Sequence, residues 1–229
     1  MRLILLGPPG AGKGTGLAYA NAMWSDRAVF QAAVAIIFSG RGDKVPAAFI
    51  KDRTALSGRA FDPAAMQAAV PYMEAQMRAH IALLSDQLAD GRRFLSGDFP
   101  GLVDANAYYN LWFMRSAFPP AASLYESAPH VPEWMARVNA IGHGERTELS
   151  RDAALQIARD SKPAEGEIAP LDAPLAGTLV TVAADDYGRD PVSGVLVGSS
   201  EHHVAIRRDD PLAGQVVVHF PRIGFAIRS

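Results

Sequence analysis

The sequence predicts a mainly α-helical protein that ends in a small β-barrel-like module. Residues 16–161 are rich in alanine, methionine and aromatic residues, with apolar side chains at the three- and four-residue spacing of helices. Residues 162–176 are rich in proline and lack periodicity, which is typical of a linker. Residues 177–229 contain short β-rich runs between Asp, Gly, Pro and Ser turns, which predicts a separate β module. Residues 1–15 form a distinct N-terminal segment with a short apolar strand and a glycine-rich turn.

The longest predicted helix starts at Asp62-Pro63, because aspartate caps helices well and proline is tolerated at the first helical position. It is expected to run to Asp90, where Gly91 supplies a left-handed cap. Its core face carries apolar residues at helical steps, namely Met66, Val70, Met73, Met77, Leu84 and Leu88. Further helices are expected over residues 17–38 (one helix or two), 102–118, 131–141 and 151–160.

The β module is expected to hold five short strands in about fifty residues, which suggests a small barrel. The expected strands cover residues 179–182, 195–197, 204–207, 216–220 and 225–227.

Composition restricts the chemistry that this chain can perform. The 229 residues include no cysteine, which excludes disulfides, thiolate nucleophiles, cysteine-ligated zinc and iron–sulfur clusters, and a cytoplasmic location is expected. The net charge of -2 gives no field that would attract nucleic acid or an anionic membrane. The most apolar window, residues 28–38, is shorter than the roughly 20 residues of a membrane span. We therefore expect neither nucleic acid nor a membrane as a partner.

A phosphate-loop pattern occupies residues 7–15, where Gly10, Gly12, Lys13, Gly14 and Thr15 fit the sequence G-x-P-G-x-G-K-G-T. In such a loop the backbone N–H groups cradle phosphates, the lysine reaches the outer phosphates and the threonine holds Mg²⁺. The pattern resembles the Walker A loop of adenylate kinases. An ATP-binding protein or phosphotransferase that uses ATP and Mg²⁺ is therefore one hypothesis.

The rest of a kinase cannot be placed in this sequence. A phosphate-loop enzyme needs a parallel sheet and a second acidic residue for Mg²⁺, but residues 16–160 show no alternation of strands and helices. We favour the interpretation that residues 1–15 have no nucleotide affinity that matters.

The start of a helix with a capping aspartate, Asp104, is predicted in residues 94–109, FLSGDFPGLVDANAYY. Gly101 is the expected N-cap residue, and Asp104 three positions later can accept the backbone N–H of Gly101. As a cap alone, this aspartate is worth about 1 kcal/mol. The segment resembles the entry to the central helix of glutathione transferases, which usually have Ser or Thr where this chain has Gly101.

Residues 128–142 are similar to the next helix of the same family, in which Trp134, Val138 and Ile141 would face inward. The resemblance covers about residues 16–161 and implies the all-helical C-terminal domain of a glutathione transferase. In that family a separate thioredoxin-like domain binds glutathione and usually carries the activating group. The early Val45-Pro46 is not followed by a predicted strand, so the glutathione site that the resemblance implies is mostly absent.

The resemblance also implies a wall for an apolar co-substrate on the first and central helices. The candidates are Tyr19, Met23, Trp24, Tyr108 and Trp112. The competing interpretation is ordinary core, because aromatics and methionines at helical spacing usually fill a bundle interior. A small apolar electrophile and a homodimer are the partners that the family suggests.

No metal site is predicted. His202 and His203 would point to opposite faces of a strand, so they cannot chelate one ion together. We therefore expect a glutathione-transferase-like protein that acts in binding or assembly and is catalytically incomplete. The alternatives are the phosphate-loop ATP binder and a truncated or composite product without a function of its own.

Overall fold

The computed structural model describes residues 15–229, apart from the side chains of Thr15, Leu17 and Asp43. The predicted N-terminal strand and the loop residues Gly10, Gly12, Lys13 and Gly14 lie outside the described residues, as does the side chain of Thr15. The described chain divides into two compact units. A helical unit comprises residues 15–53 and 60–145, and a sheet unit comprises residues 146–229 with 54–59.

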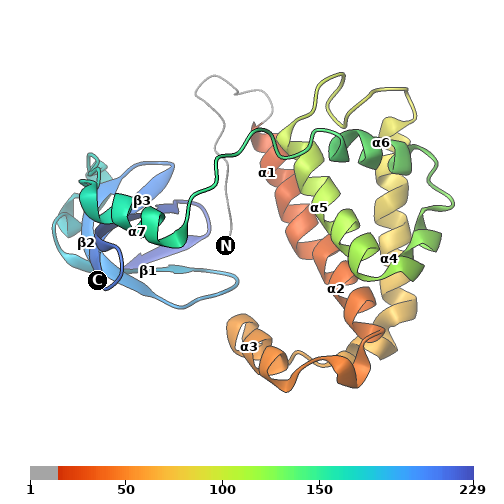
Figure 1. The fold of residues 1–229 in the computed structure, drawn as a ribbon, viewed down its shortest axis with the longest axis horizontal. Helices are drawn as coiled ribbons and strands as arrows, with labels where there is room; N and C mark the ends of the chain where they lie inside the picture. Colours follow the sequence, from red (N-terminus) through yellow and green to blue (C-terminus); the bar gives the residue numbers. More distant parts are fainter. Residues whose placement is uncertain (1–14) are drawn as a thin grey trace. The chain divides into compact units, whose positions relative to one another are not determined.

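The helical unit is a bundle in which the central helix α5 packs beside α1, α2 and α6 (Figure 1). Its α-helices are α1 (Thr15–Trp24), α2 (Phe30–Ser39), α4 (Pro63–Leu88), α5 (Leu102–Ala117) and α6 (His130–Asn139), and it also holds residues 47–53 of α3 (Ala47–Ser57). A π-helical turn, Ser25–Val29, joins α1 to α2, and shorter 3₁₀ segments cover Gly42–Lys44 and Pro119–Tyr125. The prediction of a mainly helical fold is confirmed.

The start of α4 follows the rule that the sequence suggested. The Asp62 side chain accepts from the backbone N–H groups of Ala64 and Ala65 at 2.9 and 3.1 Å, and Pro63 is the first helical residue. After the helix, Gly91 has a φ of 86°, a left-handed conformation that glycine adopts without strain. The helix ends at Leu88, slightly before the expected Asp90, and these local signals lie close to its two ends.

The stretch expected as one helix or two is a single helical path that widens at Ser25–Val29. Ser25 is fully buried, and its Oγ donates to the backbone carbonyl of Asn106 in α5. Asn110 Nδ2 donates to the Ser25 carbonyl at 2.8 Å and to Ser25 Oγ at 3.0 Å. These bonds from α5 satisfy polar groups that the wider turn places in the interior.

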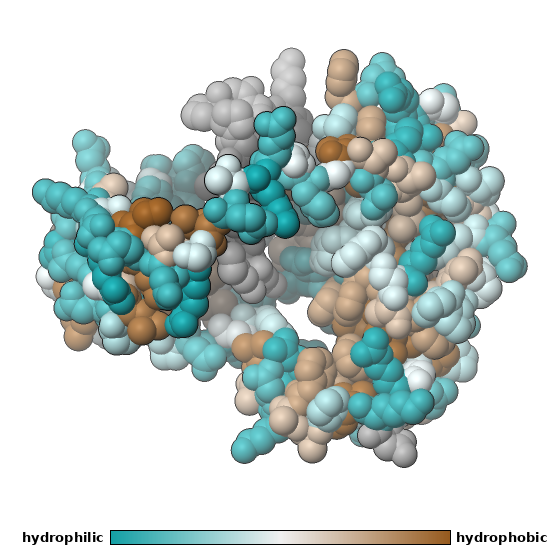
Figure 2. Space-filling model, viewed as in Figure 1, coloured by the Kyte–Doolittle hydropathy of each residue, from teal (hydrophilic) through white to brown (hydrophobic). Residues whose placement is uncertain are grey.

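Side chains of α2, α4, α5 and α6 fill the core of the helical unit. The largest completely buried ones are Ile36, Ile37, Met77, Ile81, Leu111, Met114 and Trp134. Hydrophilic and hydrophobic residues alternate over the face of this unit that is visible in Figure 2, so apolar exposure there is scattered. None of the helices among residues 15–229 is both long enough and apolar enough to cross a lipid bilayer.

The sheet unit contains five antiparallel strands in the order β4-β3-β2-β1-β5. The strands are β1 (Leu179–Ala184), β2 (Val192–Ser199), β3 (His203–Asp210), β4 (Gly214–Pro221) and β5 (Phe225–Arg228). The barrel expected from the sequence is not confirmed, because β4 and β5 form the two edges and the sheet stays open. The four-residue β5 pairs with β1 and lies at the edge opposite β4.

Helix α7 (Arg151–Asp160) groups with this sheet, although its sequence was expected to belong to the helical domain over residues 16–161. Arg159 Nε donates to the carbonyl of Leu212 at 2.7 Å, in the turn before β4. The proline-rich segment expected as a linker also pairs with the sheet. Gly166 N donates to Val197 O at 3.1 Å, and Ser199 N donates to Glu167 O at 2.9 Å.

A buried ion pair holds the end of the proline-rich segment, where a 3₁₀ turn covers Pro170–Leu175. Asp172 is 5% exposed, and its Oδ2 lies 3.0 Å from Arg222 Nη1. Burial opposes ionisation of Asp172, but hydrogen bonds from Arg222 and Ser199 outweigh it and lower the pKa of the carboxyl.

Candidate ligand-binding groove

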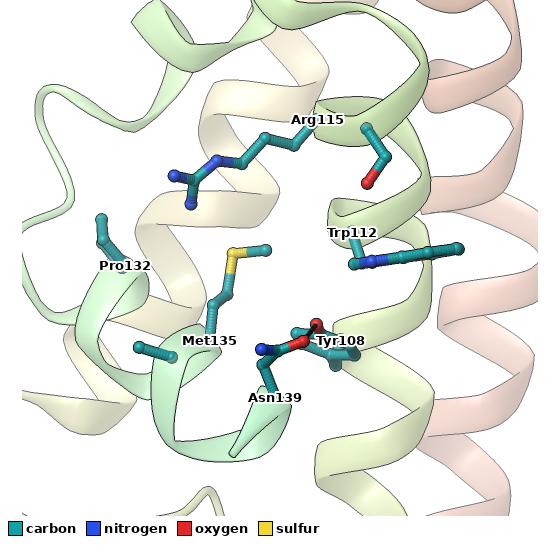
Figure 3. Close-up of a pocket in the computed structure, with 8 residues that line it drawn as sticks. Tyr108, Trp112, Arg115, Pro132, Met135 and Asn139 are labelled. Atoms are coloured by element: carbon teal, nitrogen blue, oxygen red, sulfur yellow. Dashed lines mark hydrogen bonds between the residues drawn. The ribbon is translucent and has the colours of Figure 1, made fainter. Parts of the chain in front are cut away.

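A groove of about 450 Å³ lies between α5 and α6 in the helical unit (Figure 3). From α5 it is lined by Tyr108, Trp112, Arg115 and Ser116, and from α6 by Pro132, Met135, Ala136 and Asn139. On both helices the lining positions recur at steps of three and four residues, so each set occupies one helical face. Two neighbouring faces therefore build a concave surface of ligand size.

The groove has an apolar floor and an aromatic wall. Met135 is only 5% exposed, whereas Trp112 keeps 50% of its surface exposed. Tyr108 contributes a partly buried ring and donates its hydroxyl hydrogen bond to Asn139 Oδ1 at 3.2 Å, which links α5 to α6. Figure 3 shows Tyr108 and Asn139 close together at one end. A flat apolar molecule can contact both the thioether and the aromatic rings.

Of the described residues that line the groove, one is charged, namely Arg115. Figure 3 shows its guanidinium extended toward Pro132, at the end away from Tyr108. Among the described residues no carboxylate forms an ion pair with Arg115.

The charge of Arg115 also acts on Tyr125, outside the groove lining. Burial raises the pKa of Tyr125, and the positive charge of Arg115 opposes that rise only in part.

Asp104 fixes the two helices that make the groove. It is 1% exposed, and its Oδ2 accepts the backbone N–H of Gly101 at 2.9 Å. Its Oδ1 accepts from the backbone N–H of Leu95 and from Trp134 Nε1, both at 2.8 Å. Since Trp134 belongs to α6, one carboxylate ties the start of α5 to the helix opposite it. A capping box has two reciprocal side-chain hydrogen bonds. Gly101 has no side chain, so only the bond that Asp104 accepts from Gly101 N is formed by a side chain.

The side chains expected to form an apolar wall lie in two places. Tyr108 and Trp112 line the groove, whereas Tyr19, Met23 and Trp24 on α1 are not among its lining residues. Tyr19 is 46% exposed, and Trp24 Nε1 donates to His80 Nδ1 at 3.2 Å. A ligand role for all five residues stays a prediction.

Sequence reasoning missed the α6 side of the groove and Arg115. The signal was present in the steps of three and four residues from Pro132 to Asn139, but the same pattern also describes a core face. Only the pairing of α5 with α6 shows that these positions face an open space.

The described residues do not bring together a metal site, since no group of three or more His, Asp or Glu side chains lies close enough among residues 15–229.

A family profile described as the C-terminal domain of glutathione S-transferases matches residues 43–137. The matched range includes every lining residue of the groove except Asn139. Among solved structures, a GST-like protein from Pseudomonas syringae is 30% identical, with a TM-score of 0.70. The match covers 97% of this chain and 70% of the other. This chain belongs to the glutathione S-transferase-like family.

Membership in the glutathione S-transferase-like family extends beyond the helices. A match over 97% of this chain takes in the sheet unit as well as the bundle, so the relative shares both. No curated protein matches the chain. The resemblance of residues 1–15 to an adenylate kinase loop is not borne out by these comparisons.

Proposed function

We propose that the helical unit is the co-substrate-binding part of a glutathione S-transferase-like protein and holds a small apolar molecule in the α5–α6 groove. The observation that carries this proposal is the joint lining of the groove by Tyr108, Trp112 and Met135. Two aromatic rings and a buried thioether provide an apolar surface, while the hydroxyl of Tyr108 is already satisfied by Asn139. Such a surface favours an apolar ligand over a strongly hydrated one.

The described residues do not fit glutathione in the manner of a thioredoxin-like domain. The sheet that they form is entirely antiparallel, and Val45-Pro46 leads into helix α3 rather than a strand. We therefore derive no catalytic step from residues 15–229. The proposal is that this part of the chain binds a ligand, and that any glutathione chemistry requires groups outside the described residues.

The test is calorimetric titration of the full chain with naphthylmethanol, a neutral apolar probe. We expect Trp112→Ala to weaken binding about tenfold, because loss of an aromatic wall removes apolar contact worth about 1–2 kcal/mol. Tyr72→Ala is the matched control, since Tyr72 is an exposed aromatic residue of α4 that does not line the groove. The control should bind the probe as tightly as the wild type.

Two results would contradict the proposal. If Tyr72→Ala weakened binding as much as Trp112→Ala, the probe would be bound elsewhere. If the unaltered chain did not bind the probe at all, the groove would not be the ligand site that we propose.

A further inference from the structure

The charge distribution around the groove is one-sided. Arg115 is the single charged lining residue, its side chain is exposed, and none of the lining residues is acidic. The nearest acidic residue in the α6 sequence, Glu133, is paired with Arg137, with 3.6 Å between the charged groups. Glu133 and Arg137 line a different pocket, so the charge of Glu133 is paired with Arg137 outside the groove. A positive charge therefore stands at one end of an apolar surface without a protein counterion in the described chain.

Three of the polar side chains that line the groove, Tyr108, Asn139 and Arg115, lie at its two ends. At one end, Tyr108 and Asn139 are bonded to each other at 3.2 Å. At the other end, Figure 3 shows the guanidinium of Arg115 reaching toward Pro132, with Met135 between the two ends. A ligand that spans the floor places one of its ends beside the guanidinium.

We infer that the groove selects flat aromatic carboxylic acids, whose ring lies against Trp112 and Met135 while the carboxylate pairs with Arg115. The inference rests on the proposed function and names its ligand class. The planar guanidinium presents N–H donors in a fork that matches both oxygens of a carboxylate. A neutral ring would gain the apolar contact alone, and a small hydrophilic acid would gain the ion pair alone.

The experiment compares two probes with the same ring system, naphthoate and naphthylmethanol, in calorimetric titrations of the full chain. Because Arg115 is exposed, we expect a preference for naphthoate of about fivefold, the upper range for an ion pair in contact with water. The preference should shrink as salt is raised, since mobile ions screen exposed charges. Arg115→Gln should weaken the binding of naphthoate more than that of naphthylmethanol, so that the preference is lost.

Arg151→Gln is the matched control, because it removes the same charge from an exposed position in the sheet unit. It should retain the full preference for naphthoate. Circular dichroism of each variant checks that the helical content is preserved.

The outcomes separate this inference from the proposed function. Equal affinity for the two probes, with binding still dependent on Trp112, would overturn the carboxylate preference and leave the apolar groove intact. A preference that survives Arg115→Gln would also overturn it, since the carboxylate would be recognised elsewhere. If neither probe bound, both the inference and the proposed function would be wrong.

Discussion

Asp104 Oδ1 accepts the indole hydrogen bond of Trp134 at 2.8 Å, which joins the first turn of α5 to the centre of α6. The same oxygen accepts the Leu95 backbone N–H at 2.8 Å. The family resemblance predicted a helix cap at this position, and the structure adds a buried bridge between two helices. That bridge fixes the spacing of the groove because Met135 follows Trp134 directly in α6.

Replacing Asp104 with alanine should therefore lower the free energy of unfolding by much more than the loss of a helix cap alone would. Leu95 N and Trp134 Nε1 would both become buried donors without an acceptor, each costing about 1–3 kcal/mol, so we expect the free energy of unfolding to fall by about 2–6 kcal/mol. Urea unfolding followed by tryptophan fluorescence measures this loss. Asp98→Ala is the control, since it removes an exposed carboxylate from the same segment. A loss for Asp104→Ala of no more than about 1 kcal/mol would show that the interhelical bridge contributes nothing.

The contact of His80 with Trp24 should make the stability of the helical unit depend on pH. Burial lowers the pKa of His80 below 6.5, and its Nδ1 accepts from Trp24 Nε1, which requires an unprotonated Nδ1. The pKa is lower in the folded state, so the stabilisation is present above pH 6.5 and is lost as the pH falls toward the folded value.

Thermal unfolding across this range tests the prediction for His80. His80→Gln should flatten the pH dependence, whereas His143→Gln, at an exposed position after α6, should not. An unchanged pH profile for His80→Gln would rule out this histidine as the source.

Tyr109 should resist ionisation at alkaline pH. Burial, together with a hydrogen bond from its hydroxyl to Asp26, raises the pKa of Tyr109 to about 12. A raised folded value means that this stabilisation is complete below pH 10 and is lost as the pH rises toward about 12.

An ultraviolet titration of tyrosinate formation checks the prediction for Tyr109. Tyr109→Phe should remove a tyrosine that ionises near pH 12 from the titration, and Tyr72→Phe, on the exposed surface of α4, should leave that tyrosine in place. Asp26→Asn should lower the apparent pKa of Tyr109 while burial keeps it above the ordinary value. If Asp26→Asn left it unchanged, the hydrogen bond would have no part in the shift.

Gly194 in β2 has no room for a side chain. A Cβ there would lie 2.7 Å from the carbonyl oxygen of Arg207 and 3.1 Å from Ile206 Cβ in β3. Gly194→Ala should destabilise the sheet unit by about 1–3 kcal/mol, because the backbone of β3 would have to move. Faster hydrogen exchange of the β2 and β3 amides is the expected readout.

Gly166→Ala provides the comparison for Gly194→Ala. A Cβ at Gly166 would meet only the Cα of Gly198 at 3.6 Å and His203 Nε2 at 4.0 Å, both ordinary contacts. Exchange in β2 and β3 should therefore stay close to that of the wild type. Equal effects of the two substitutions would show that close approach at Gly194 is not the cause.

The sequence by itself determined the elements whose signals are local. The start of α4 at Asp62-Pro63, the cap at Asp104 and the short strands after residue 177 depend on neighbouring residues along the chain, and these follow known helix and strand rules. The family resemblance of the helices was also visible in the sequence, and the comparisons confirm it.

Only the tertiary structure decided which faces meet. It places α6 opposite α5 to form the groove, gives Arg115 no carboxylate partner among the described residues, groups α7 with the sheet and keeps the sheet open. Helical spacing shows that residues share a face, but it does not show whether that face packs on a neighbour or borders an open space. That choice depends on contacts between residues far apart in sequence, such as Asp104 with Trp134 and Tyr108 with Asn139.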